Sequence, residues 1–389
     1  MPQRPFALLD LDAMLTEEQR MIRDTVREYV DERIKPEIAD WFERGELPAR
    51  ELAKEMGEIG LLGMHLEGYE CAGTDAISYG LANLELEAGD SGIRSLVSVQ
   101  GSLAMFAIHH WGSEEQKQEW LPRMARGEAI GCFGLTEPDF GSNPAGMRTF
   151  AKRDGDDWVL NGTKMWITNG NVSDVAVIWA NTDDGIRGFV VPTDTKGFTA
   201  NLVHKKMSLR ASVTSELVLD NVRLPASAMF PEVRGLRGPL TCLGEARFGI
   251  VWGVLGAARD CLESALDYAI ARVQFDRPIA GFQLTQRKFA EMATALDTGW
   301  LLAHRIGTLK DQHAVRPEMI SMGKFNNAKA AIEIARECRS IMGGNGITLE
   351  YPVIRHSNNL EAVFTYEGTH EMHTLVIGDA LTGLPAYRG

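Results

Sequence analysis

The spacing of apolar residues divides this chain into three blocks with different periods. From about residue 15 to residue 127, apolar positions recur every three or four residues, which is typical of amphipathic helices. Thr16 with Gln19, and Ser113 with Gln116, have the spacing of a capping box, so each pair predicts the start of a helix. Further helices are expected after Pro48, over residues 75–88 and over residues 95–108.

The middle block has short runs of β-forming residues instead of helical periods. Asn-Gly and Asp-Gly pairs, which favour tight turns, separate these runs. The predicted strands cover residues 158–160, 175–179, 188–191, 198–203 and 216–219. Because they are evenly spaced without helices between them, we expect a small antiparallel sandwich or barrel.

The third block returns to helical periods with longer elements. Helices are predicted over residues 240–272, 283–311, 317–342, 352–363 and 369–381. The four longest are expected to form an antiparallel bundle, in which Gly249, Gly253 and Gly256 allow another helix to approach closely. The pattern therefore predicts three domains: a helical domain at 1–128, a β domain at 129–235 and a helical bundle at 236–389.

Composition and charge narrow the class of protein. The 389 residues are 44% hydrophobic and 24% charged, as in soluble globular proteins, and the net charge of -13 argues against a nucleic-acid surface. The five cysteines are scattered without C-x-x-C spacing, which indicates free thiols in a reducing compartment. No apolar targeting segment is visible before residue 15, and the apolar run at 248–258 is too short to span a bilayer. We therefore expect a cytoplasmic protein, or a mitochondrial matrix protein if the chain is a processed form.

One carboxylate stands out as a candidate catalytic group. Glu367 lies in the turn Tyr366-Glu367-Gly368-Thr369, between an apolar segment and the last predicted helix. A carboxylate held among apolar groups without a close cation has a raised pKa, so it can accept a proton from carbon. The alternative is a solvated Glu just before a helix that is capped by Thr369.

Other candidate sites are weaker when each is taken alone. His370 and His373 lie one helical turn apart, but the H-E-x-x-H spacing of a zinc site is absent. No G-x-G-x-x-G follows a strand and no P-loop motif is present, which argues against a Rossmann nicotinamide site or a P-loop nucleotide site. The segment F-G-L-T-E-P at 133–138 and the segment W-I-T at 166–168 offer hydroxyl groups and an aromatic wall to a polar ring or a phosphate, or they are plain turns.

Taken together, five motifs in this order resemble the acyl-CoA dehydrogenase family of flavoenzymes. They are F-G-L-T-E-P at 133–138, W-I-T at 166–168, R-x-Q-F at 272–275, G-G-N-G at 343–346 and Y-E-G-T at 366–369. The resemblance covers essentially the whole chain. It implies an all-α N-terminal domain, a central antiparallel β domain and a C-terminal four-helix bundle, assembled as a homotetramer with FAD as the cofactor. One departure is Ser340, where many relatives carry Gln.

The resemblance also implies which residues bind the flavin. One group would hold FAD within the chain: Phe133, Leu135, Thr136, Gly141, Ser142, Trp166, Thr168 and Thr369. A second group would reach the FAD of a neighbouring subunit: Arg272, Phe275, Gln283, Gly343 and Gly344.

The segment at 89–95 resembles the glutaryl-CoA dehydrogenase branch of the family. By this resemblance, Arg94 would bind the free carboxylate of a glutaryl group, and Glu87 and Ser95 would orient the guanidinium. Glu367 would be the catalytic base, and its backbone N–H would hold the thioester carbonyl together with an FAD hydroxyl. The remaining implied substrate contacts are Tyr366, Gly368, Ser142, Leu243 and Arg247.

The implied activity is the oxidation and decarboxylation of glutaryl-CoA to crotonyl-CoA and CO2 in lysine and tryptophan degradation. Electrons would pass to an electron-transfer flavoprotein. Three alternatives remain open: a non-decarboxylating glutaryl-CoA dehydrogenase, a dehydrogenase for short or branched acyl-CoA, and a non-catalytic scaffold of this fold. Arg94 argues against a neutral acyl substrate, and Glu367 argues against a scaffold.

Overall fold

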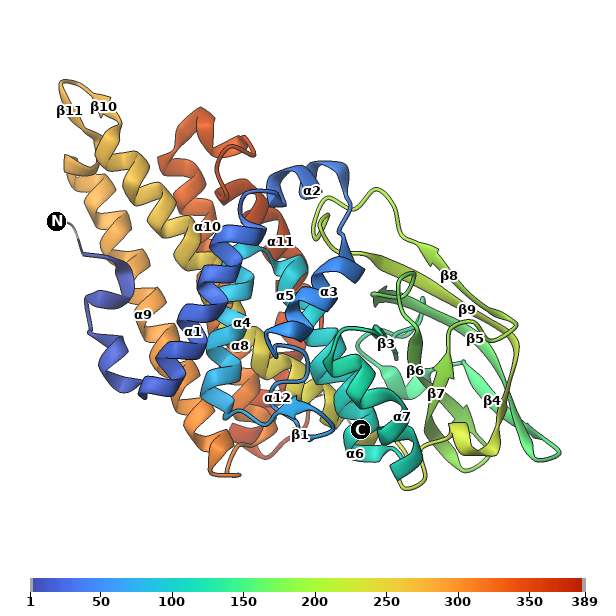
Figure 1. Cartoon of the computed structure of the whole chain (residues 1–389). Helices are drawn as coiled ribbons and strands as arrows, with labels where there is room; N and C mark the ends of the chain where they lie inside the picture. Colours follow the sequence, from blue (N-terminus) through green and yellow to red (C-terminus); the bar gives the residue numbers. More distant parts are fainter. Residues whose placement is uncertain (1–2, 387–389) are drawn as a thin grey trace.

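The strands gather at one end of the molecule and most of the long helices at the other (Figure 1). The structure is a computed structural model that describes residues 3–386. The described chain confirms the predicted order of helical, β and helical regions.

The N-terminal helical region contains both predicted capping boxes. The Thr16 and Ser113 side chains each accept a hydrogen bond from the backbone N–H three residues later, and Gln19 and Gln116 return the contact. Its helices are η1 (Pro5–Ala7), η2 (Leu11–Met14), α1 (Glu17–Tyr29), η3 (Val30–Ile34), α2 (Ile38–Arg44), α3 (Ala49–Glu58), α4 (Ala76–Gly89), α5 (Ser91–Ser98), η4 (Val99–Met105), α6 (Phe106–Trp111) and α7 (Glu114–Ala125). The pattern missed α2, which is short and has no side-chain cap at its start.

The middle region is a seven-stranded sheet in the order β3-β6-β4-β5-β9-β8, with β7 beside β6. Its strands are β3 (Gly131–Gly134), β4 (Phe150–Asp154), β5 (Asp157–Thr168), β6 (Val175–Thr182), β7 (Gly185–Pro192), β8 (Phe198–Leu202) and β9 (Thr214–Pro225). Most pairs are antiparallel, as predicted, but β3 runs parallel to β6, and β4 meets β6 in parallel at one residue pair. The polar strand β4 was not predicted. A second short sheet, β1 (Glu67–Gly68) with β2 (Cys71–Ala72), lies in the N-terminal region.

The C-terminal region is a bundle built around the long helix α8. Its helices are α8 (Arg237–Ala271), α9 (Gln283–Asp311), α10 (Pro317–Ile341), α11 (Val353–Thr365) and α12 (His370–Thr382). α8 packs against α9, α10 and α11, and the hairpin of β10 (Val273–Gln274) and β11 (Arg277–Pro278) projects at the end of the molecule away from the sheet (Figure 1). Within the described residues, α8 alone is long and apolar enough to cross a membrane, and 67% of its apolar window is buried inside the fold.

The glycines of α8 allow the N-terminal helix α4 to lie directly against it. A Cβ at Gly256 would lie 1.7 Å from the backbone oxygen of Leu84, and a Cβ at Gly253 would lie 2.2 Å from Glu87 Oε2. No side chain fits in that space, so glycine is required where the two helices cross. This close packing buries Glu87 between the helices.

Asp90 joins all three regions at the end of α4. Its Oδ1 accepts a hydrogen bond from Gly92 N at 2.7 Å, which caps α5. Its Oδ2 accepts from Arg355 Nη1 at 2.5 Å and from Asn359 Nδ2 at 2.7 Å, both on α11. Asn359 Oδ1 in turn accepts from Leu209 N of the middle region at 2.8 Å. The helix that carries Arg94 is therefore fixed at the junction of the three regions.

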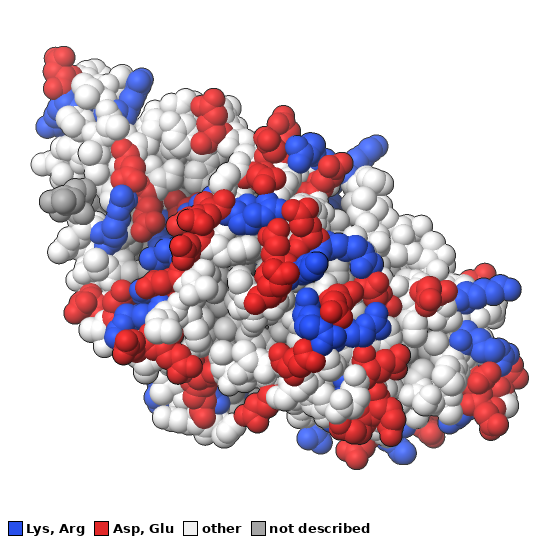
Figure 2. All heavy atoms as spheres, viewed as in Figure 1, with Lys and Arg blue, Asp and Glu red and all other residues white. Residues whose placement is uncertain are grey.

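Charged side chains of both signs are interspersed over the face shown in Figure 2. Since neither sign dominates that face, it offers no extended basic surface of the kind that binds nucleic acid.

Candidate active site

The Glu367 turn connects α11 to α12 in an unusual backbone conformation. Glu367 has a φ of 53° and Gly368 a φ of 94°, both in the left-handed region. Thr369 then caps α12 by accepting a hydrogen bond from Met372 N at 3.2 Å. A non-glycine residue at positive φ is strained by about 1–3 kcal/mol and persists only where its surroundings hold it.

Two cations, the buried Lys324 and the half-buried Arg247, hold this turn through its backbone. Arg247 Nε of α8 donates to the Glu367 carbonyl oxygen at 2.6 Å. Lys324 Nζ of α10 donates to Gly368 O at 2.7 Å and also to Tyr366 O. Three consecutive carbonyl oxygens are therefore bound by cationic side chains, which stabilises the strained conformation.

The Glu367 carboxyl lies in the interior of the protein rather than in solvent. Its Oε2 is buried and has no hydrogen-bond partner within the described part of the chain. Burial raises the pKa of Glu367, although Arg94, Lys324 and Arg247 act in the opposite direction. The expectation of a carboxylate without a close cation is therefore wrong, because three cations surround it. The raised pKa is still found, because desolvation outweighs their attraction.

Arg94 is completely buried on α5, and its charge is balanced by Glu87. Only 1% of its surface is exposed, and Nε donates to Glu87 Oε2 at 2.8 Å. Burial lowers the pKa of Arg94, but Glu87, Tyr366 and Glu367 together raise it more, so the guanidinium stays charged. Nη2 donates to the Tyr366 hydroxyl, whereas Nη1 makes no hydrogen bond to a described residue. The guanidinium is thus held beside the Glu367 turn with donors left for an anion.

The two residues predicted to orient Arg94 differ in what they do. Glu87 is 0% exposed, and its other oxygen, Oε1, accepts from Ser91 Oγ at 2.8 Å, so it is fixed at both ends. Ser95 Oγ is buried but has no hydrogen-bond partner among residues 3–386. The structure therefore gives the orienting contact to Glu87, while the Ser95 hydroxyl remains open to a bound molecule.

The two segments of the middle region that are predicted to bind the flavin lie side by side. Met165 N donates to Thr136 O at 2.8 Å, which ties the end of β5 to the loop after β3. The hydroxyls of Thr136, Ser142 and Thr168 make no hydrogen bonds in the described chain, and Trp166 is 58% exposed at a φ of 64°. Free hydroxyls beside an exposed indole fit a planar ring with a polar edge, so this surface suits an isoalloxazine.

The remaining residues of the first predicted flavin group do not offer free polar side chains on this surface. Phe133 and Leu135 are each only 6% exposed and pack in the core, so their side chains are not free to contact a bound ring. Gly141 lies in the exposed loop, with nothing within 4 Å of its Cβ position. Thr369 is occupied as the cap of α12.

Gln100 joins the helical segment that carries Arg94 to β3, the strand that leads into the predicted flavin-binding loop. Its Oε1 accepts from Gly131 N, the first residue of β3, at 2.7 Å. Its Nε2 donates to Met124 O at 3.0 Å and to Ala129 O at 2.8 Å. Since Gln100 continues the helix that carries Arg94, the two halves of the site are held in a fixed relation.

The second predicted flavin group lies elsewhere in the chain. Arg272, Phe275 and Gln283 are exposed around the β10–β11 hairpin, and Phe275 is 89% exposed. Gly343 and Gly344 are exposed in η8 (Gly343–Ile347) after α10. The structure does not bring these residues to the middle region of the same chain, so their predicted contact with a neighbouring subunit stays a prediction.

The predicted CoA contacts are spread over two elements. Leu243 and Arg247 are one turn apart on α8, and both are half-buried. Ser142 lies in the exposed loop of the middle region. Within the described chain, Arg247 alone of the three forms a hydrogen bond with the Glu367 turn.

Lys324 contacts the Glu367 turn and was missed by the sequence analysis. It is 2% exposed, and it shares the buried face of α10 with Ile320 and Asn327. A lysine at a position where the helical period requires a buried side chain is the signal that would have identified it.

Three family profiles cover most of the chain. The N-terminal, middle and C-terminal domains of acyl-CoA dehydrogenase match residues 16–128, 132–222 and 233–382. The chain belongs to the acyl-CoA dehydrogenase family. The order of its helical, β and helical regions follows the order of these three domains.

Individual relatives agree with the family match. The chain is 35% identical over 381 residues to the mitochondrial short-chain specific acyl-CoA dehydrogenase of Bos taurus, covering 96% of this chain and 92% of that protein. It is 68% identical to a crystal structure of glutaryl-CoA dehydrogenase from Mycobacterium smegmatis, with a TM-score of 0.99 and full coverage of both chains. A structure of a glutaryl-CoA dehydrogenase from the same organism in complex with FADH2 matches at 66% identity, a TM-score of 0.98 and full coverage of both chains.

Proposed function

We propose that this acyl-CoA dehydrogenase binds FAD and oxidises glutaryl-CoA, with decarboxylation to crotonyl-CoA and CO2. The observation that carries the choice of substrate is Arg94, a buried guanidinium beside the Glu367 turn with donors left unused. The 68% identity to a glutaryl-CoA dehydrogenase supports the same substrate.

The charge of Arg94 explains why a dicarboxylic acyl group would be preferred. A carboxylate that enters a buried cavity loses its hydration and requires a cation with hydrogen bonds in return. Arginine offers a planar pair of donors that matches a carboxylate. Because Glu87 already holds Nε, the guanidinium is oriented before the substrate arrives, and little side-chain entropy is lost on binding.

Glu367 is placed to move the protons of the reaction. Its carboxylate would accept the α-proton of the thioester, and its own N–H, which has no partner in the described chain, would donate to the thioester oxygen. Thr136, Ser142, Trp166 and Thr168 would hold FAD, which would supply the hydride acceptor when bound. After CO2 leaves the unsaturated product, protonated Glu367 would return a proton to the γ-carbon.

Anaerobic titration of the purified holoenzyme with glutaryl-CoA tests this proposal. We expect the flavin absorbance to bleach with the wild-type chain, and CO2 and crotonyl-CoA to form when a chemical electron acceptor is added. The Glu367→Gln variant should keep its FAD and lose the bleaching by at least about a thousandfold in rate, because it cannot accept the proton. A flavin that stays oxidised with glutaryl-CoA would reject the proposal. Glutaconyl-CoA without CO2 would identify the non-decarboxylating alternative.

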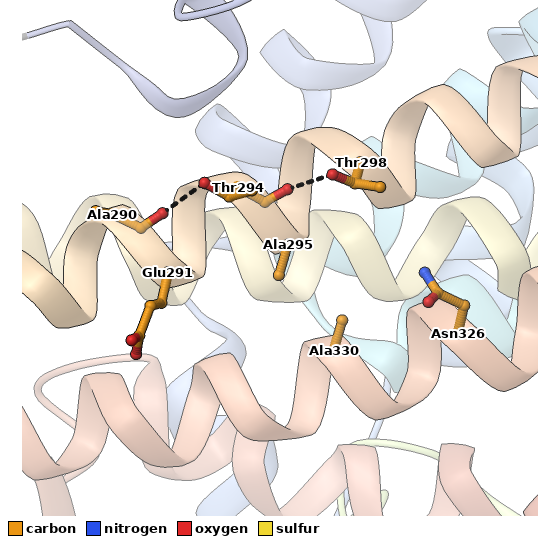
Figure 3. A pocket seen from close by; sticks show the side chains of 7 residues that line it. All are labelled: Ala290, Glu291, Thr294, Ala295, Thr298, Asn326 and Ala330. Atoms are coloured by element: carbon orange, nitrogen blue, oxygen red, sulfur yellow. Dashed lines mark hydrogen bonds between the residues drawn. The ribbon is translucent and has the colours of Figure 1, made fainter.

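The assembly is proposed to be a homotetramer. Exposed apolar residues on the C-terminal region support an interface, among them Phe275 at 89% and Leu284 at 75% exposure. Small side chains also line an open groove between α9 and α10, where Ala295 and Ala330 point toward one another (Figure 3).

We further propose an electron-transfer flavoprotein as the electron acceptor. We also propose the cytoplasm as the location, because the five cysteines are free thiols.

A further inference from the structure

Lys324 lies where α10 meets both the Glu367 turn and α12. Ser321, one turn earlier on α10, contacts His373 Nδ1 of α12 through its Oγ at 3.1 Å. Lys324 on the same face reaches the turn itself, and its Nζ bonds two carbonyl oxygens that flank the Glu367 residue. The two contacts fix α10 against the segment that carries the base.

One of the two carbonyls bound by Lys324 belongs to the peptide group that carries the Glu367 N–H. In a peptide group the oxygen and the nitrogen share one delocalised π-system. A cation that bonds the oxygen withdraws electron density from the nitrogen, so hydrogen bonds on the two sides strengthen one another. An ammonium on Tyr366 O therefore makes the Glu367 N–H a better donor than it would be with a neutral partner.

We propose that Lys324 is a positioning residue of the reaction, which polarises the Tyr366–Glu367 peptide and so strengthens the Glu367 N–H as a donor to the thioester oxygen. The inference deepens the proposed function and rests on it. Arg247, which bonds the next carbonyl at 2.6 Å, acts in the same way on the Gly368 N–H but not on the Glu367 N–H.

The charge of Lys324 depends on pH. Burial, together with the charges of Arg247 and Arg94 and against the opposing effect of Glu367, lowers the pKa of Lys324 to about 7. His373 also packs against the turn, and burial lowers its pKa to about 3, so it stays neutral beside the ammonium. At this pKa, Lys324 is charged in about half of the molecules at pH 7, so its polarising effect on the peptide should grow as the pH falls below 7.

The enolate equilibrium of bound acetoacetyl-CoA tests the inference without turnover. The β-carbon of this ligand is a ketone without a hydrogen that could leave as hydride, so the ligand cannot be dehydrogenated. Its enolate absorbs in the ultraviolet, which makes the equilibrium measurable. We would titrate the holoenzyme and the variants Lys324→Met, Lys324→Gln and Lys324→Arg with this ligand across pH. Lys329→Met is the matched control, because Lys329 lies on the same helix with a side chain 57% exposed.

We expect Lys324→Met and Lys324→Gln to shift the enolate equilibrium by about tenfold toward the neutral ligand, which is part of the effect of losing a whole oxyanion donor. With glutaryl-CoA, kcat should fall about tenfold to a hundredfold while KM changes much less, because the lost interaction forms chiefly in the transition state. Lys324→Arg should recover part of both losses, and Lys329→Met should match the wild type. FAD content, measured by absorbance, should be unchanged in each.

An unchanged enolate equilibrium in Lys324→Gln at full FAD content overturns the inference, because this variant keeps an N–H donor but lacks the positive charge. If Lys324→Met does not fold, the Gln and Arg variants still decide the matter, and equal enolate equilibria in these two also overturn it. Failure of the proposed function is distinguishable, since in that case glutaryl-CoA does not bleach the wild-type flavin. A bleached wild type with wild-type behaviour in all Lys324 variants rejects this inference alone.

Discussion

Replacing Arg94 by Gln should remove the preference for a dicarboxylic acyl group without removing the dehydrogenase chemistry. The side chain is 1% exposed and its Nε is paired with Glu87 Oε2 at 2.8 Å. The single variant therefore loses the cation that we propose binds the substrate, and it also strands a buried carboxylate. The double variant Arg94→Gln with Glu87→Gln removes both charges and separates the two effects.

The magnitudes follow from the burial of this pair. Breaking a buried pair by removing one partner costs about 3–5 kcal/mol of stability, so the single variant should melt well below the wild type. The double variant should regain most of that loss, because it leaves no unpaired charge. For the substrate, losing a buried charged partner costs about 2–5 kcal/mol of binding, which is about thirtyfold to several thousandfold in kcat/KM.

The assay compares kcat/KM for glutaryl-CoA and butyryl-CoA with a chemical electron acceptor in the wild type, the single variant and the double variant. Butyryl-CoA has no terminal carboxylate, so its kcat/KM in the double variant should stay within about threefold of the wild type. The ratio of the two substrates should fall by the full factor in both variants. Equal losses for glutaryl-CoA and butyryl-CoA in the double variant would refute the role of Arg94 in substrate choice.

Two further predictions concern the stability of the fold. Burial raises the pKa of Asp297 to about 6 from its usual 3.8, so above pH 6 the folded protein must hold a buried carboxylate that the unfolded chain ionises freely. Asp297→Asn should therefore raise the free energy of unfolding by about 1–3 kcal/mol at pH 7.5. This gain should shrink as the pH falls through 6 toward 4. A gain in thermal melts that does not depend on pH would contradict the assignment. Gly256→Ala should prevent α4 from packing on α8, because its Cβ would lie 1.7 Å from Leu84 O, whereas Gly244→Ala on the same helix meets nothing within 4 Å. Soluble yield and melting temperature should collapse for the first and stay the same or rise for the second, and similar values for both would show that the helices can move apart.

Local signals in the sequence were reliable where neighbouring residues decide the structure. The capping boxes at Thr16 and Ser113 each need only four consecutive residues, and both are formed. The predicted helix at 283–311 coincides with α9. The helix α2 was missed because it is short and no side chain caps its start, and β4 was missed because one of its five residues alone is buried.

The part of the site that short, local motifs define was predicted from the sequence. Glu367, Arg94 and Glu87 were recognised from short motifs, and the structure brings Arg94 and Glu87 into contact across the break between α4 and α5. Lys324 was not recognised, since it lies 42 residues before Tyr366 and meets the turn only when α10 packs beside it. The closeness of Arg94, Arg247 and Lys324 to the Glu367 carboxylate was missed in the same way, because these cations come from three different helices.

The sequence by itself determined the order of helical and β regions, the family, and the turn in which the candidate base lies. These depend on short-range periodicity and on motifs that a few adjacent residues define. Only the tertiary structure decided the environment of that base. Its pKa depends on the balance between desolvation and the charges of Arg94, Lys324 and Arg247, and each of these terms depends on distances between helices that are far apart in the chain.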